Sequence, residues 1–154
     1  MDKIDKFSGQ WSFLSNAYSA TIRFRGRDWK TAEHALQGSK AQSDSQRDVI
    51  GGAKSPSEAK RLGWCIPLPP GWEEEKSAIM KEILHQKFSN PFLREMLKGT
   101  GSALLVNGSH PADSYWGFYD GEGENILGRL LMEVREEIVA EDSIDFIFSG
   151  GTVQ

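Results

Sequence analysis

The stretch that decides the fold runs Thr31-Ala32-Glu33-His34-Ala35-Leu36-Gln37-Gly38-Ser39-Lys40. Thr31 is a favoured N-cap residue, so the sequence predicts a helix that begins directly after it. Along this helix Glu33, Gln37 and Lys40 lie on one face, because consecutive residues are turned by ~100°. A carboxylate, an amide and an amine therefore point the same way. The face is either a solvated ion-pair surface or part of a site.

The residues before this helix predict a β-hairpin. Polar and apolar side chains alternate over residues 21–25, Arg25-Gly26 favours a turn, and residues 27–29 form the returning strand of the hairpin. Further upstream, residues 11–18 are rich in aromatic and small polar side chains but have no clean period. We expect this segment to form the wall of a pocket rather than a helix or strand, with a core-packing loop as the alternative.

Capping residues and apolar periodicity predict further helices downstream. One is bounded by Ser55 as N-cap and Gly63 at the C′ position, with Pro56 at N1 and Glu58 completing a capping box. The other predicted helices span residues 44–50, 72–88, 91–98 and 127–138, and residues 103–106 are predicted to form a buried strand.

These elements define the fold class as α+β, a single mostly helical domain with a small antiparallel β element. We expect the domain to cover residues 1–140. Residues 141–154 are a C-terminal extension to which the pattern assigns no role. Residues 107–125 have little regular pattern, and a segment of that length in a compact domain is typically either functional or disordered. Its aromatic residues Trp116, Phe118 and Tyr119 argue against disorder.

Composition narrows the class of protein. The 154 residues carry a formal net charge of -4, which argues against a broad basic surface for nucleic acid, although Arg23, Arg25, Arg27 and Lys30 form a local cluster that can bind phosphate. The N-terminus resembles no signal peptide, no apolar run is long enough to span a membrane, and Cys65 is the single cysteine. We expect a cytoplasmic protein.

The sequence favours neither a metal site nor a nucleophilic triad. The three histidines are widely separated and Cys65 has no neighbour that would lower its pKa, so we expect no metal and no cofactor. The glycines of residues 120–125 are interleaved with acids that repel phosphate. The remaining candidates are Glu33 with Lys40, and Asp113 with Trp116, although an aspartate after a proline is commonly a turn residue.

Several motifs occur in order along the chain. They are Phe13-Leu14-Ser15-Asn16, Trp29 to His34, Gln37-x-x-Lys40, Ala53 to Gly63, Asp113-x-x-Trp116-Gly117 and Gly123-x-Asn125-x-Leu127-Gly128. From about Phe7 to Ile138 the sequence resembles the NADAR, or YbiA-like, family. One departure is Gly38, which stands where alanine is usual in that family.

The resemblance implies a mixed α and β N-glycosidase fold whose members cleave the bond between ribose and a base nitrogen. The substrates implied are the ribosylaminopyrimidines of riboflavin synthesis, and ADP-ribose attached to guanine in nucleic acid. By motif matching, the catalytic residues are Glu33, Lys40 and Asp113. The same matching gives the substrate-binding residues as Phe13, Asn16, Gln37, Trp116, Gly123 and Asn125.

The chemistry of this reaction agrees with that assignment. Breaking the bond builds positive charge on the sugar and negative charge on the leaving nitrogen, so a carboxylate and a proton donor are needed on either side of it. Glu33 and Asp113 can divide these roles. Lys40 either forms an imine with the opened sugar, which requires a lowered pKa, or only binds a hydroxyl or phosphate.

We therefore expect an N-glycosidase that acts on a small nucleotide-like substrate or on ADP-ribosylated nucleic acid. The alternative is a non-catalytic module that binds ADP-ribose or a related nucleotide. The two hypotheses differ at Glu33 and Lys40, because a binding module has no use for an acid/base pair. We expect no membrane association, and no obligate protein partner is evident.

Overall fold

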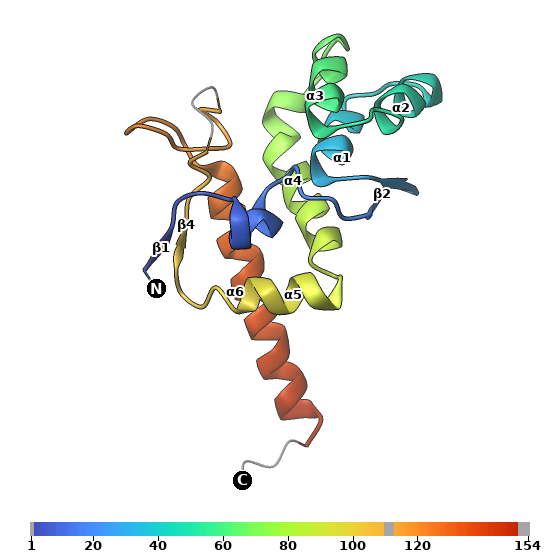
Figure 1. The fold of residues 1–154 in the computed structure, drawn as a ribbon. Helices are drawn as coiled ribbons and strands as arrows, with labels where there is room; N and C mark the ends of the chain where they lie inside the picture. Colours follow the sequence, from blue (N-terminus) through green and yellow to red (C-terminus); the bar gives the residue numbers. More distant parts are fainter. Residues whose placement is uncertain (1, 110–112, 151–154) are drawn as a thin grey trace.

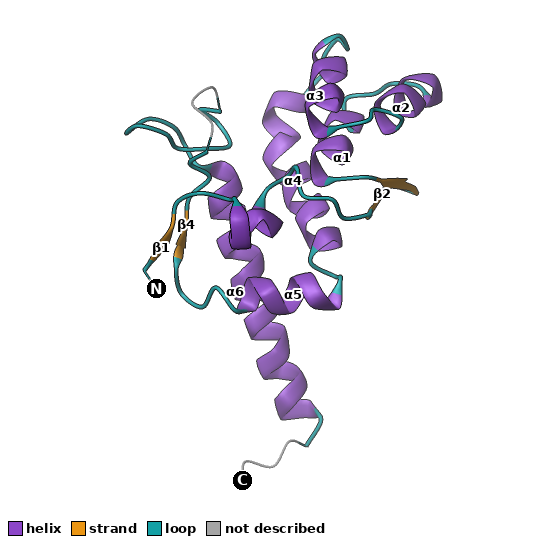
Figure 2. Cartoon of the chain, in the orientation of Figure 1, coloured by secondary structure: helices purple, strands orange, loops and turns teal. Residues whose placement is uncertain are grey.

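The structure is a computed structural model that describes residues 2–109 and 113–150. Helices dominate, and the strands are short (Figures 1 and 2). In chain order the elements are β1 Lys3–Ile4, the 3-10 helix η1 Gly9–Leu14, β2 Ile22–Phe24, β3 Arg27–Trp29, α1 Ala32–Gly38, α2 Asp44–Gly51, α3 Pro56–Trp64, α4 Trp72–Lys87, α5 Pro91–Lys98, β4 Leu104–Leu105 and α6 Ile126–Phe148. The predicted α+β class, mostly helical with a small antiparallel element, is confirmed.

The strands form two separate pairs. The predicted hairpin is present, with β2 and β3 antiparallel and Arg23 opposite Asp28. The second pair was not predicted: β1 lies parallel to β4, with Ile4 opposite Leu105, and Figure 1 shows the two side by side. This pairing fastens the N-terminus to the segment that leads into residues 107–125.

The core lies between α4, α6, α1 and the hairpin. From α4, Met80, Ile83 and Leu84 are fully buried, and α6 contributes Leu127 and Leu131. Trp29 of β3 lies over α1, where Gly38 leaves room for it: a Cβ at position 38 would lie 2.2 Å from the Cη2 atom of the indole. The departure at Gly38 thus concerns core packing rather than the substrate.

Two predicted helix starts are confirmed. The backbone N–H of His34 donates to the Thr31 hydroxyl at the start of α1, and the N–H of Glu58 donates to the Ser55 hydroxyl at the start of α3. The predicted end of α3 was wrong. Gly63 lies inside the helix rather than at C′, and its place against α1 gives the reason: a Cβ there would lie 1.9 Å from Gln37 Oε1.

The segment 11–18 also differs from expectation, because η1 covers its first part. Phe13 is 2% exposed and belongs to the core, whereas Ser15, Asn16 and Ala17 line a cavity. The segment is therefore part core and part wall.

Helix α6 continues past the predicted end at residue 138 and projects beyond α5 (Figure 1). Residues 141–148 of the expected extension prolong this helix, and residues 151–154 lie outside the described residues. Over 2–109 and 113–150, none of the helices combines the length and apolar character needed to cross a membrane.

Candidate active site

A cavity of about 330 Å³ lies where α1, α3, the segment after η1 and the loop after β4 meet. Its described lining combines two carboxylates, three amides, a lysine, three serine hydroxyls and an indole with an apolar floor. The lining residues are Phe7, Ser15, Asn16, Ala17, Glu33, Leu36, Gln37, Pro56, Ser57, Lys60, Asn107, Ser109, Asp113, Trp116 and Leu127. Five sequence-predicted site residues are among them: Asn16, Glu33, Gln37, Asp113 and Trp116.

Glu33 is presented by the first turn of α1. Its backbone N–H donates to the carbonyl of Asn16 at 3.0 Å, which ties the segment after η1 to the helix. Its side-chain oxygen Oε1 accepts from Gln37 Nε2 at 3.4 Å, one turn along. Burial raises the pKa of the Glu33 carboxyl, and the Lys60 charge and the Gln37 hydrogen bond oppose this rise. Glu33 is thus a desolvated carboxyl that favours its protonated form more than a surface glutamate does.

Asp113 reaches the same cavity from the loop after β4. One carboxylate oxygen accepts from the backbone N–H of Trp116 at 3.2 Å, and the other accepts from Asn107 Nδ2 at 3.3 Å. Asp113 therefore closes a turn, as its sequence context suggested, and lines the cavity as well. His110, Pro111 and Ala112 of the same motif lie outside the described residues.

Trp116 is one of the residues that line the cavity, and it is partly buried. The Tyr115 ring packs against it edge-on, with ring centroids 4.7 Å apart and an interplanar angle of 82°. Its carbonyl accepts from the backbone N–H of Leu127, so the loop is fixed to the start of α6. The indole is therefore held in place before a ligand arrives.

Four other predicted site residues do not line the described cavity. Phe13 lies in the core. Gly123 has a φ of 126° and passes so close to the backbone that a Cβ would lie 2.2 Å from the Gly117 carbonyl oxygen. Asn125 joins two backbones, since its Oδ1 accepts from the N–H of Asn107 and its Nδ2 donates to the carbonyl of Leu105, both at 2.9 Å.

Lys40 is the fourth. Its Nζ lies 4.9 Å from the ring centroid of Trp72, at the start of α4, and the side chain is buried. Burial lowers the pKa of the Lys40 amine, although Glu33 and Glu73 oppose this effect. The charge of Lys40 acts on Glu33, but more weakly than that of Lys60.

Lys60 and Ser57 are functional candidates that sequence reasoning missed. Both lie on α3 and line the cavity, and Lys60 is the largest charge influence on Glu33. The sequence signal was their spacing of three on a well-capped helix, which places them on one face. That spacing alone does not tell a cavity face from a solvent face.

The predicted basic cluster is occupied by protein partners. Arg23 pairs with Asp28 at 3.2 Å, and Arg27 pairs with Asp48 at 2.6 Å. Lys30 Nζ donates to the carbonyl of Ala53 at 2.9 Å. These contacts leave the cluster poorly suited to phosphate.

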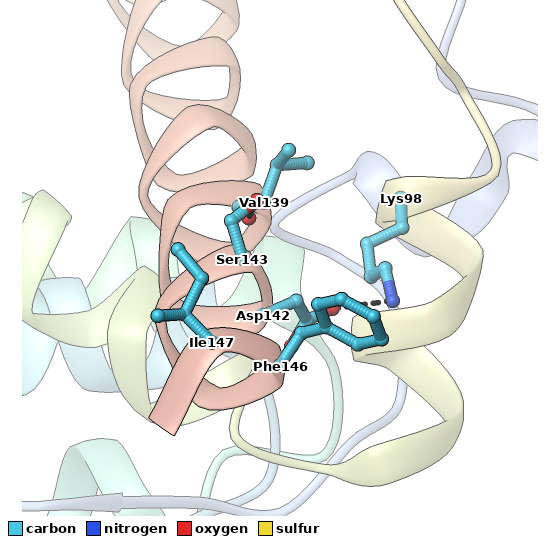
Figure 3. Close-up of a pocket in the computed structure, with 6 residues that line it drawn as sticks. All are labelled: Lys98, Val139, Asp142, Ser143, Phe146 and Ile147. Atoms are coloured by element: carbon cyan, nitrogen blue, oxygen red, sulfur yellow. Dashed lines mark hydrogen bonds and ion pairs between the residues drawn. The ribbon is translucent and has the colours of Figure 1, made fainter. Parts of the chain in front are cut away.

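A separate cavity of about 430 Å³ lies where α6 passes α5 (Figure 3). Its lining is mainly apolar, with the ion pair between Lys98 and Asp142, 2.5 Å apart, at one side. It has none of the paired carboxylates that bond cleavage at a sugar requires. In the described part of the chain, no three His, Cys, Asp or Glu side chains are grouped as metal ligands.

The fold and the cavity define a small α+β domain with two carboxylates facing one nucleoside-sized space. The sequence matches the NADAR domain family over residues 3–139, and the chain belongs to that family. The resemblance seen in the motifs is thereby confirmed.

Three comparisons illustrate the relationship. The chain is 36% identical over 138 residues to N-glycosidase YbiA of Escherichia coli (strain K12), covering 87% of this chain and 86% of that protein. It is 39% identical over 125 residues to the chloroplastic riboflavin biosynthesis protein PYRR of Zea mays, covering 72% of this chain and 20% of that longer protein. The NMR structure of the E. coli protein YbiA superposes with a TM-score of 0.80 at 35% identity, covering 92% of this chain and 88% of that one.

Proposed function

We propose that this N-glycosidase hydrolyses the bond between ribose and the amino nitrogen of a ribosylaminopyrimidine that carries a phosphate on its sugar. The observation that carries the proposal is the pairing of a desolvated carboxyl, Glu33, with a second carboxylate, Asp113, in one cavity. Two carboxyl groups in unlike surroundings are the usual equipment for cleaving a glycosidic bond.

The environments of the two carboxyl groups suggest how they divide the work. Burial raises the pKa of Glu33, so it suits the proton donor to the leaving nitrogen. Asp113 accepts hydrogen bonds from Asn107 and from the backbone of Trp116, so its carboxylate group is held in one orientation. It suits the carboxylate that faces the positive charge on the sugar or orients the attacking water.

The size and polarity of the cavity support a small substrate. Its volume of about 330 Å³ is near the lower end of the ~300–1,000 Å³ typical of small-molecule sites. Lys60 and Ser57 lie together on its wall and can supply an ammonium and a hydroxyl to a phosphate. A base attached to ADP-ribose needs more room and is the less favoured substrate. The name of the Zea mays relative, a riboflavin biosynthesis protein, also favours a ribosylaminopyrimidine as the substrate.

The position of Lys40 supports a non-covalent route. Its amine lies over Trp72 and not in the described lining, so an imine with the sugar requires the side chain to move. We assign Lys40 an electrostatic role, in which its charge favours the ionised product form of Glu33 after proton transfer.

The proposal is tested by comparing three substrates: the ribosylaminopyrimidine with its phosphate, the same compound without phosphate, and ADP-ribosylated guanosine. We expect release of the free base, detected by mass, to be fastest from the phosphorylated compound. Lys60→Met should raise its KM about tenfold to a hundredfold, as expected for a lost charged hydrogen bond, and leave the KM for the unphosphorylated compound unchanged.

Lys54→Met is the matched control, because Lys54 precedes the same helix but does not line the described cavity. Equal effects of Lys60→Met on both compounds would contradict the phosphate assignment. Faster release from ADP-ribosylated guanosine would contradict the proposed substrate class.

A further inference from the structure

The side chain of Gln37 occupies a site that is unusual for a substrate-binding amide. It lines the cavity but is only 4% exposed, and its Nε2 donates to Glu33 Oε1 at 3.4 Å. Its own Oε1 is buried and has no hydrogen-bond partner among the described residues. The amide nitrogen is thus directed at the neighbouring carboxyl. A buried oxygen without a hydrogen bond costs free energy, so the surrounding packing must hold the amide in this position.

The packing that maintains it comes from α3. At Gly63 an added Cβ would lie 1.9 Å from Gln37 Oε1 and 2.8 Å from its Cδ. Real Cβ atoms do not approach so closely, so any larger residue at position 63 displaces the amide. Gly63 is the next-to-last residue of α3, and a glycine loses more backbone freedom on folding than an alanine does. This backbone cost is consistent with a glycine kept for the room it gives.

We propose that Gln37 is a positioning residue for Glu33, and that Gly63 permits this position of the amide because a glycine has no side chain to displace it. The Nε2 group fixes one carboxylate oxygen and leaves the other for the substrate. This role differs from substrate binding, and it rests on the proposed function because Glu33 must be the proton donor for its orientation to affect the rate.

The groups that act on Glu33 are few enough to interpret a titration. Gln37 acts from α1, Lys40 acts from the turn that follows α1, Lys60 acts from α3, and Asp113 acts from the loop after β4. The Gln37 hydrogen bond lowers the pKa of Glu33, against the larger effect of burial. Removing or displacing the amide therefore shifts the pKa of Glu33 upward.

The first test is a direct titration of Glu33 by carboxyl carbon NMR in the wild type, Gln37→Leu and Gly63→Ala. We expect the pKa of Glu33 to rise in both variants. The control is Gly51→Ala, where the added Cβ makes only an ordinary contact, 3.6 Å from Trp29, and the pKa should not move. An unchanged pKa in Gln37→Leu would overturn the proposal. This readout needs no substrate, so it stands apart from any failure of the proposed function.

The second test is a double-mutant cycle in kcat. Misplacing a catalytic group costs about tenfold to a hundredfold, so Gly63→Ala alone should lower kcat by that factor with little change in KM. In the Gln37→Ala background the amide is gone, and adding Gly63→Ala should lower kcat no further. Equal losses in both backgrounds would show that Gly63 acts on the fold generally, and would overturn its assignment. If the wild type cleaves no ribosylated base at all, the proposed function fails while the titration still decides the positioning role.

Discussion

Lys87 offers a prediction that depends only on burial. This lysine lies in the last turn of α4, is 1% exposed, and donates from Nζ to the carbonyl of Ser15 at 2.8 Å. Its nearest rings are those of Phe88 and Tyr18, with centroids 5.4 and 5.7 Å from Nζ. Burial lowers the pKa of Lys87 from 10.5 to about 7. Since each tenfold change in proton affinity is ~1.4 kcal/mol, keeping the ammonium charged in the core costs about 5 kcal/mol.

The sign of the pH dependence follows from this lowered pKa. Below pH 7 Lys87 is protonated in both the folded and the unfolded chain, so the full cost of burying its charge lowers the free energy of unfolding. Between about pH 7 and 10.5 the unfolded chain binds more protons at Lys87 than the folded chain does, so the free energy of unfolding rises with pH. From pH 6 to pH 9 the contribution from Lys87 alone is about 3 kcal/mol.

Lys87→Met, which roughly conserves volume, removes that contribution. Urea denaturation of both proteins at pH 6 and pH 9 gives four free energies of unfolding. The difference between Lys87→Met and wild type should be about 3 kcal/mol more favourable to the variant at pH 6 than at pH 9. The loss of the hydrogen bond to Ser15 and the effects of all other titrating groups contribute to the free energies of unfolding at both pH values. These contributions largely cancel when the two differences are compared. A difference that does not change with pH would refute the reasoning.

Three further predictions concern the cavity and the helix that carries Glu33. Trp116→Ala should weaken substrate binding about tenfold to a hundredfold by loss of base stacking, measured by calorimetry; a large fall in Tm with unchanged affinity would instead make Trp116 a core residue. Gly38→Ala should lower the free energy of unfolding by about 1–3 kcal/mol, because the new Cβ meets the Trp29 ring; denaturation with no loss of stability would contradict that packing. Lys40→Arg should retain most of the wild-type rate, and turnover in borohydride should leave no sugar-bearing mass on Lys40; a trapped adduct mapped there would establish the covalent route.

Local signals predicted much of the fold. The hydroxyl caps at Thr31 and Ser55, and the turn between β2 and β3, are decided by residues within a few positions of each other. The pairing of β1 with β4 was missed because each strand has two residues and the strands are far apart in the sequence. Gly63 was misplaced because a glycine that ends a helix and a glycine that lets another side chain approach look the same in sequence.

The site was predicted less evenly, because motif matching identifies residues and not their surroundings. Glu33, Asp113 and Trp116 line the cavity, but their catalytic and binding roles remain predictions. Phe13 and Asn125 belong to the motifs but have structural roles. Phe13 packs in the core, and Asn125 joins two backbone segments by hydrogen bonds. Lys60 was overlooked because a lysine on a helix face is usually solvated, and only the packing of α3 on α1 brings it to Glu33.

The central claim is that Glu33 supplies the proton for cleavage of a ribose-to-base bond. The most direct measurement is base release from the phosphorylated ribosylaminopyrimidine by wild type and Glu33→Gln, together with substrate affinity for both proteins. An amide keeps the shape of the carboxyl but cannot transfer a proton, so Glu33→Gln should bind within about tenfold of wild type and release no base. Undiminished release by the purified variant would remove Glu33 from the mechanism and contradict the account.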